Sequence, residues 1–138
     1  MSQEKQIVNK FLEAIANGNS KLMLGLLTDD AVVIIPGPPK VPFNGRYEGR
    51  KSIIQAFKLF EEYLEIRDHT LKIIFGEGEH VVVIINETSR AKRTDRFIKQ
   101  DTCWYFRVKD QHIKLWQVFE DTEQVSWAWS DDAIRREE

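Results

Sequence analysis

Cysteine is almost absent from this sequence, and long hydrophobic runs are missing altogether. Cys103 stands alone, so no internal disulfide can form, which suits a reducing compartment and leads us to expect a cytoplasmic protein. The longest purely apolar runs, residues 31–35 and 81–85, have five residues each, far too few to span a bilayer. The charged start "MSQEKQIVNK" has a helical pattern and no hydrophobic core of a secretory signal. We therefore expect no membrane partner.

A strong charge of either sign is also lacking, because the formal net charge is −2. Such a chain has no general attraction to nucleic acid, so we expect no nucleic-acid partner. The one basic run, "RAKRTDR" at residues 90–96, has no interleaved aromatic residues and is typical of a solvated hairpin turn rather than a phosphate site. Histidine and acidic residues lack metal-ligand spacing, so we expect no metal. With 138 residues, the chain is predicted to form one domain over residues 1–138.

The first half of the chain has helical periodicity. Residues 2–18 place Ile7, Val8, Phe11, Leu12 and Ile15 on one face, and Asn19 or Ser20 can cap a short second helix. "TDD" is expected to end that helix before a short buried strand at residues 31–35. Residues 37–49 are rich in proline and glycine and predict a long loop. A third helix is predicted over residues 50–66.

The second half changes to the period of strands. Two strands are predicted within residues 69–91 and joined at Gly76–Gly78, followed by a long strand at 96–108 and a last strand at 113–121. Helices followed by consecutive strands predict an α+β fold, with a curved antiparallel sheet wrapped over the N-terminal helices. A sheet closed in this way by helices forms a cone with a hydrophobic interior, which suits a ligand cavity.

Three stretches carry a more specific signal: "FLEAIANGNSKLMLGLLTDDAVV", "PGPPKVPFNGRYEGRKSI" and "WQVFEDT". In these stretches and in the order of its elements, the chain resembles the SnoaL-like, ketosteroid-isomerase-related branch of the NTF2-like superfamily, from about Ile7 to about Trp129. The resemblance implies an NTF2-like (cystatin-like) cone that binds a small, mostly apolar molecule without a cofactor. It does not fix the activity, because this fold carries isomerases, cyclases, dehydratases, epoxide hydrolases and non-enzymes.

The catalytic residues of the resembling enzymes have no counterparts here. The oxyanion tyrosine of ketosteroid isomerases aligns with Phe11, their base with Ile35 and their second aspartate near Trp104. An aspartate of limonene-epoxide-hydrolase-like enzymes aligns with Val118. The histidines used by scytalone-dehydratase-like enzymes are not matched either, because His69, His80 and His112 are expected at strand starts or turns, apart from a shared pocket.

The resemblance also sets a strand register. It turns Trp116, Val118 and Glu120 toward the cone, because side chains alternate along a strand. The same alignment turns Val83, Ile85 and Glu87 inward, together with Thr102, Trp104 and Phe106. The expected cavity wall consists of Phe11, Ile35, Phe57, Phe60, Trp104, Trp116 and Val118.

Two carboxylates, Glu87 and Glu120, are then the candidate catalytic groups. A glutamate in an aromatic cavity is desolvated, so it can exchange protons with a substrate near neutral pH, and a second carboxylate nearby separates an acid from a base. The alternative is that both lie in water at strand ends, near Arg90 or Lys114. Two functions therefore stay open: a cofactor-free isomerase or cyclase with Glu120 as general base and Glu87 as its partner, and a non-catalytic ligand-binding or dimerisation module.

The other face of the sheet is expected to carry Leu115, Phe119, Tyr105 and Cys103. Because helices cover only one face of the sheet, an apolar second face predicts a homodimer that packs sheet on sheet.

Overall fold

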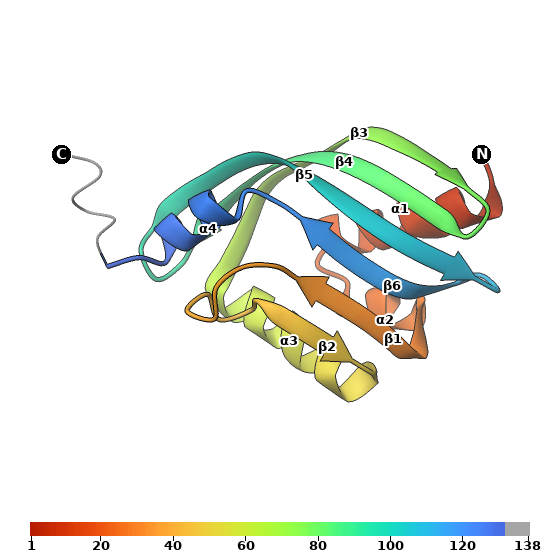
Figure 1. Ribbon diagram of the computed structural model, residues 1–138, viewed down its shortest axis with the longest axis horizontal. Coiled ribbons are helices and arrows are strands. Elements are labelled where there is room, and N and C mark those ends of the chain that lie inside the picture. The colour runs from red at the N-terminus through yellow and green to blue at the C-terminus, as the bar shows by residue number, and fades with distance from the viewer. Residues whose placement is uncertain (132–138) are drawn as a thin grey trace.

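The computed structural model describes residues 1–131 and begins with two capped helices (Figure 1). Helix α1, Gln3–Ala16, starts where the Ser2 side chain accepts a hydrogen bond from the Lys5 backbone N–H. Helix α2, Ser20–Gly25, starts in the same way, because Asn19 accepts from the Leu22 N–H at 3.1 Å. Four residues of the apolar face predicted for α1, Ile7, Val8, Phe11 and Leu12, are buried, and Ile15 is partly buried. Both predicted helices are present.

Helix α3, Arg50–Tyr63, ends three residues before the predicted position. Leu64 already has extended backbone angles, and strand β3, Leu64–Glu77, begins there. The reason is strand pairing: Leu64, Glu65 and Ile66 lie opposite residues 91, 90 and 89 of strand β4, His80–Ala91. Glu65 also binds the Arg90 guanidinium at 2.7 Å. Long-range pairing thus overrides the local helical periodicity.

The sheet has six strands in the order β2-β1-β6-β5-β4-β3. The remaining strands are β1 (Leu27–Ile35), β2 (Gly45–Glu48), β5 (Arg96–Lys109) and β6 (His112–Phe119). Since β1 runs parallel to β6 while the other pairs are antiparallel, the sheet is mixed and the purely antiparallel prediction is wrong. The four consecutive strands β3 to β6 are confirmed.

Two further corrections concern the first strands. Strand β1 begins at Leu27. The "TDD" segment therefore lies inside the strand, whereas it was predicted to separate the second helix from the strand. The predicted loop 37–49 contains β2, which pairs with Val32–Ile35 of β1. The glycine- and proline-rich composition concealed this short edge strand, although β1, the strand with which it pairs, is close to it in the sequence.

The sheet curves, and its concave face holds the core (Figure 1). Helix α1 packs against β3 to β6, and α3 packs against β1, β2 and β3. Phe11 of α1 meets Phe106 and Trp116 edge to face, with ring centroids 5.7 and 5.1 Å apart. The predicted alternation of β5 and β6 is confirmed, because Trp104, Phe106, Trp116 and Val118 are all buried. The α+β class and the cone-like arrangement follow directly from this packing.

A fourth helix, α4 (Thr122–Ala128), follows the last strand. Asp121 caps it by accepting from the Gln124 backbone N–H at 3.1 Å. Trp129 then packs its ring against Phe43, 5.2 Å away, which ties the loop before β2 to the end of the chain that the structure describes. Among residues 1–131, no helix is long and apolar enough to cross a membrane.

Candidate functional site

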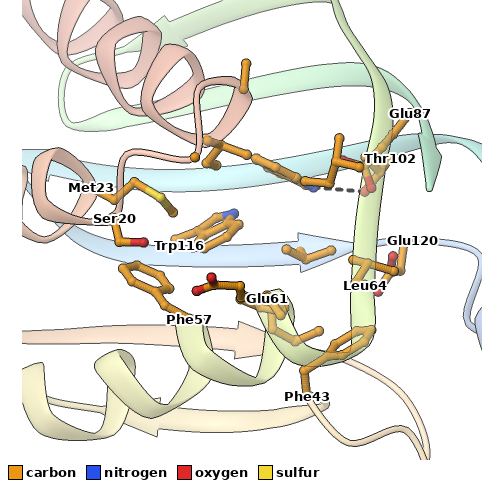
Figure 2. A pocket seen from close by; sticks show the side chains of 18 residues that line it. Ser20, Met23, Phe43, Phe57, Glu61, Leu64, Glu87, Thr102, Trp116 and Glu120 are labelled. Atoms are coloured by element: carbon orange, nitrogen blue, oxygen red, sulfur yellow. Dashed lines mark hydrogen bonds between the residues drawn. The ribbon is translucent and has the colours of Figure 1, made fainter. Parts of the chain in front are cut away.

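A cavity of about 410 Å³ lies between the concave face of the sheet and the helices (Figure 2). Its wall combines the sheet residues expected from the register with side chains from α1, α2 and α3 and the segments around them. The residues that line it are Ile15, Ala16, Gly18, Ser20, Met23, Ile35, Phe43, Phe57, Phe60, Glu61, Leu64, Ile66, Glu87, Thr102, Trp104, Trp116, Val118 and Glu120. Ser20, Met23 and Phe57 lie at one end, and Glu87, Thr102 and Glu120 at the other.

The centre of the wall is aromatic. The rings of Trp104 and Trp116 lie 5.0 Å apart, and Phe60 lies 6.3 Å from Trp116 and 5.3 Å from Phe43. Six of the seven expected wall residues line the cavity: Ile35, Phe57, Phe60, Trp104, Trp116 and Val118. Phe11, the seventh, lies one layer behind, fully buried under Trp116. It supports the wall and does not form it, because its ring packs against those of Phe106 and Trp116.

Four polar residues form a row across the concave face. They come from β3, β4, β5 and the end of β6, and we call them the polar row: His69, Glu87, Gln100 and Glu120. His69 of β3 lies directly opposite Glu87 of β4, and Glu87 lies directly opposite Gln100 of β5. Gln100 then donates to Glu120, just beyond β6, at 2.9 Å. Each carboxylate in the polar row thus has one partner, supplied by an adjacent strand.

Glu120 is partly buried at the polar end of the cavity. Burial is the main cause that raises the pKa of its carboxyl from 4.5 to about 7. The hydrogen bond from Gln100 opposes this rise, while the negative charges of Glu87 and Asp121 add to it. Gln100 is fixed in orientation because its Oε1 accepts from the Asp121 backbone N–H at 2.8 Å. At neutral pH the Glu120 carboxyl can therefore both take up and release a proton.

Glu87 is bound by a histidine that the sequence pattern misplaced. His69 Nδ1 lies 3.2 Å from Glu87 Oε2, and the two side chains are only 7% and 11% exposed. The expectation that His69 lies at a strand start, apart from the site, is therefore wrong. His80 and His112 do open their strands, as predicted. A β-bulge between Ile66 and Asp68 shifts the alternation of β3 and turns His69 inward, and a second irregularity follows between Leu71 and Ile73.

Three further polar side chains lie in or behind the wall: Thr102, Trp116 and His69. Thr102 Oγ1 accepts from the Trp104 indole N–H at 3.0 Å and donates to the Phe119 carbonyl at 3.2 Å. Trp116 Nε1 and His69 Nε2 are buried and have no hydrogen-bond partner among the described residues. Thr102 thus holds the Trp104 ring in place.

The charges in the wall have one sign. Glu61, Glu87 and Glu120 line the cavity, and no lysine, arginine or histidine is among its lining residues. The alternative prediction placed Glu87 and Glu120 in water near Arg90 or Lys114. Neither of these basic residues lines the cavity. Within residues 1–131 no group of three histidine, cysteine or acidic side chains is arranged to hold a metal ion. The wall can exchange protons and can exclude ligands with a negative charge.

Comparison with solved structures extends the similarity over nearly the whole chain. An NTF2-like protein from Burkholderia xenovorans is 26% identical, with a TM-score of 0.83 over 93% of this chain and 96% of that chain. TerC, crystallised with polyporic acid, is 15% identical, with a TM-score of 0.80 over 93% and 98% of the two chains.

A third structure, described as that of a SnoaL-like polyketide cyclase candidate from Mesorhizobium loti, is 16% identical, with a TM-score of 0.67 over 83% of this chain and 97% of that chain. At such identities the last two similarities show the fold alone. Comparison with curated proteins gives no match. The family model of the SnoaL-like domain, however, matches residues 8–116. With that match and the curved sheet over its helices, the chain belongs to the SnoaL-like family and has an NTF2-like fold.

Proposed function

We propose that this protein binds a small, mostly apolar molecule in its cavity and moves a proton on it without a cofactor, as an isomerase or cyclase does. Glu120 is the proton-exchanging group, and Glu87 is its partner. The observation that supports this most is the position of the Glu120 carboxyl, at the polar end of a cavity otherwise lined by aromatic and aliphatic side chains. A carboxyl in such surroundings holds its proton to neutral pH and can return it to a carbon or oxygen of the substrate.

The test is proton exchange on an enolisable ketone in heavy water. β-Tetralone, an apolar ketone with an acidic C–H, is incubated with the protein, and loss of its α-proton signal is followed by NMR. We expect the wild type to accelerate the exchange and Glu120→Gln to abolish most of the acceleration. Glu123→Gln, at an exposed position in the first turn of α4, is the matched control and should behave as wild type. Equal exchange by wild type and Glu120→Gln contradicts the proposal.

The charge of the wall narrows the class of ligand. Since its ionisable lining residues are all glutamates, a ligand carboxylate would lack a counter-charge and would be repelled. We propose a neutral or cationic ligand. Naphthylmethylamine, naphthylmethanol and naphthoate share one ring frame and differ in charge, so their binding can be compared through the fluorescence of Trp104 and Trp116. We expect naphthoate to bind weakest; preferential binding of naphthoate contradicts this part.

A non-catalytic binding or dimerisation module is the second candidate. It is favoured by the apolar residues at the catalytic positions of the ketosteroid isomerases, where Phe11, Ile35 and Trp104 stand here. The convex face of the sheet supports a dimer in either case. Ile73, Phe75 and Phe119 are about half exposed there, at 49%, 55% and 51%. We propose a homodimer through this face, which light scattering or sedimentation can test.

A further inference from the structure

His69 is a buried titratable side chain to which the proposed proton transfer assigns no role. It reaches the concave face because of a bulge in β3. Ile66, before the bulge, and His69, after it, both lie opposite residues of β4 that face the core, Ser89 and Glu87. Their separation of three residues breaks the period of two. A bulge that places an ionisable ring against a buried carboxylate is a specific feature of this strand.

The contact with the Glu87 carboxylate favours one tautomer of the His69 ring, because an ionised carboxylate only accepts hydrogen bonds. Nδ1 faces Glu87 Oε2 at 3.2 Å, so a proton on Nδ1 is donated to the carboxylate. Nε2 is buried without a partner among the described residues. A neutral ring with its proton on Nδ1 leaves only an acceptor unpaired, whereas a doubly protonated ring would bury an unpaired, charged N–H donor. The neutral tautomer bound to an ionised Glu87 is therefore the arrangement of lower cost.

On the basis of the proposed function, we propose that His69 is a positioning residue: by donating its Nδ1–H it holds the ionised Glu87 carboxylate toward the cavity, where its charge faces Glu120. The two carboxylates then have separate tasks. Glu87 stays charged and supplies repulsion, and Glu120 carries the proton that is exchanged. The charged groups that act on Glu120 are Glu87 from β4 and the adjacent Asp121, and Glu61 from α3 lines the same cavity, so His69 is the one basic group of the polar row.

His69 has a packing role as well, because its ring lies 5.6 Å from that of Trp104. Two substitutions separate packing from positioning. H69F keeps an aromatic ring and removes the donor. H69N removes the ring and places an amide N–H near the position of Nδ1. The matched control is H80F, because His80 also binds a neighbour through Nδ1, the Tyr105 hydroxyl at 2.6 Å, and also stacks on its ring, but on the convex face.

The measurement is the NMR titration of the Glu120 carboxyl carbon in the wild type and the three variants, with thermal unfolding as a check on folding. In H69F, Glu87 loses its donor and takes up a proton or turns away, so its charge no longer opposes ionisation of Glu120. We expect the midpoint of the Glu120 titration to fall by roughly one pH unit in H69F and to stay within a few tenths of the wild type in H69N and H80F. If folded H69F titrates as the wild type does, His69 only packs against Trp104 and the proposal is overturned.

Proton exchange on β-tetralone separates this inference from the proposed function. A shifted midpoint in H69F together with no exchange by the wild type upholds His69 as the positioning residue and contradicts the proposed catalysis. If the wild type catalyses the exchange and H69F leaves its pH profile unchanged, the proposed catalysis is upheld and the positioning role of His69 is contradicted. If H69N shifts the midpoint as far as H69F, the donor is not the cause and the proposal fails.

Discussion

The two carboxylates of the polar row lie on one concave surface, yet their surroundings differ. Glu87 is bound by His69, a group that can itself carry charge, and both side chains are nearly inaccessible to water. Glu120 is bound by Gln100, a neutral amide, and lies at the end of β6 beside Asp121. Burial is the main cause that raises the pKa of Glu120 to about 7, and the hydrogen bond from Gln100 only partly offsets it. The comparison teaches that two glutamates on one concave surface meet different surroundings, because the neighbouring strand supplies a different partner side chain to each.

The largest expected effect comes from removing either carboxylate in turn. Glu120→Gln should reduce the rate of β-tetralone exchange by about 100-fold, the usual contribution of a positioned general base. Glu87→Gln removes only a charge that acts on that base, so about tenfold is expected. Exchange rates at pH 8 in heavy water measure both. A larger loss in Glu87→Gln than in Glu120→Gln would reverse the assignment of base and partner.

Stability should depend on pH through the same group. A carboxyl whose pKa is raised by folding binds its proton more tightly in the folded state, so stability falls as the pH rises from about 4.5 through about 7. The full shift corresponds to roughly 3 kcal/mol, an upper figure because Glu120 is only partly buried. Denaturant unfolding at pH 5 and pH 8 should show this decline in the wild type and a smaller one in Glu120→Gln. Identical declines would contradict the account.

Gln100 tests the other half of the comparison. Its hydrogen bond lowers the pKa of Glu120, so Gln100→Met, which keeps the length and removes the donor, should raise that pKa further above 7. The pH profile of proton exchange should move up by roughly one pH unit or more, because the Gln100 hydrogen bond affects the pKa of Glu120 more than the charge of Glu87 does. Gln117→Met is the matched control, because Gln117 lies on the opposite face of β6. A downward movement of the profile in Gln100→Met would be inconsistent with a donor at this position.

The smallest effect on Glu120 is expected from the convex face. Phe119→Ser removes an exposed ring next to Glu120 in sequence but on the other side of the sheet. It should weaken the proposed dimer, visible by sedimentation over a range of concentrations, and leave the pH profile of exchange unchanged. A moved profile would mean that the two faces of β6 are coupled.

The sequence predicted one side of the polar row and missed the other, for a physical reason. The family resemblance set the register, and regular alternation along β4, β5 and β6 then placed Glu87, Trp104 and Glu120 on the concave face. His69 was expected at a strand start because the predicted helix ran to residue 66, whereas β3 begins at Leu64 and a bulge after Ile66 turns His69 toward the concave face.

Other features that the sequence did not predict depend on contacts between segments that are far apart in the chain. Gln100 has no distinguishing local pattern, and its role comes from contacts with Glu120 and Asp121, about twenty residues away in the chain. Likewise, the end of α3 at Tyr63 is set by pairing with β4, and the side-by-side arrangement of β1 and β6 joins segments from opposite ends of the chain. Periodicity reports which face a residue takes within an element, and it carries no information on which elements pair.

The pH profile of β-tetralone exchange, measured for the wild type and Glu120→Gln, tests the central claim most directly. If Glu120 is the proton-exchanging group, the rate rises with pH through a midpoint near 7, as the carboxyl ionises, and the rise is absent in the variant. A profile that is the same in both proteins, or a midpoint near the ordinary 4.5 of a glutamate, would contradict it.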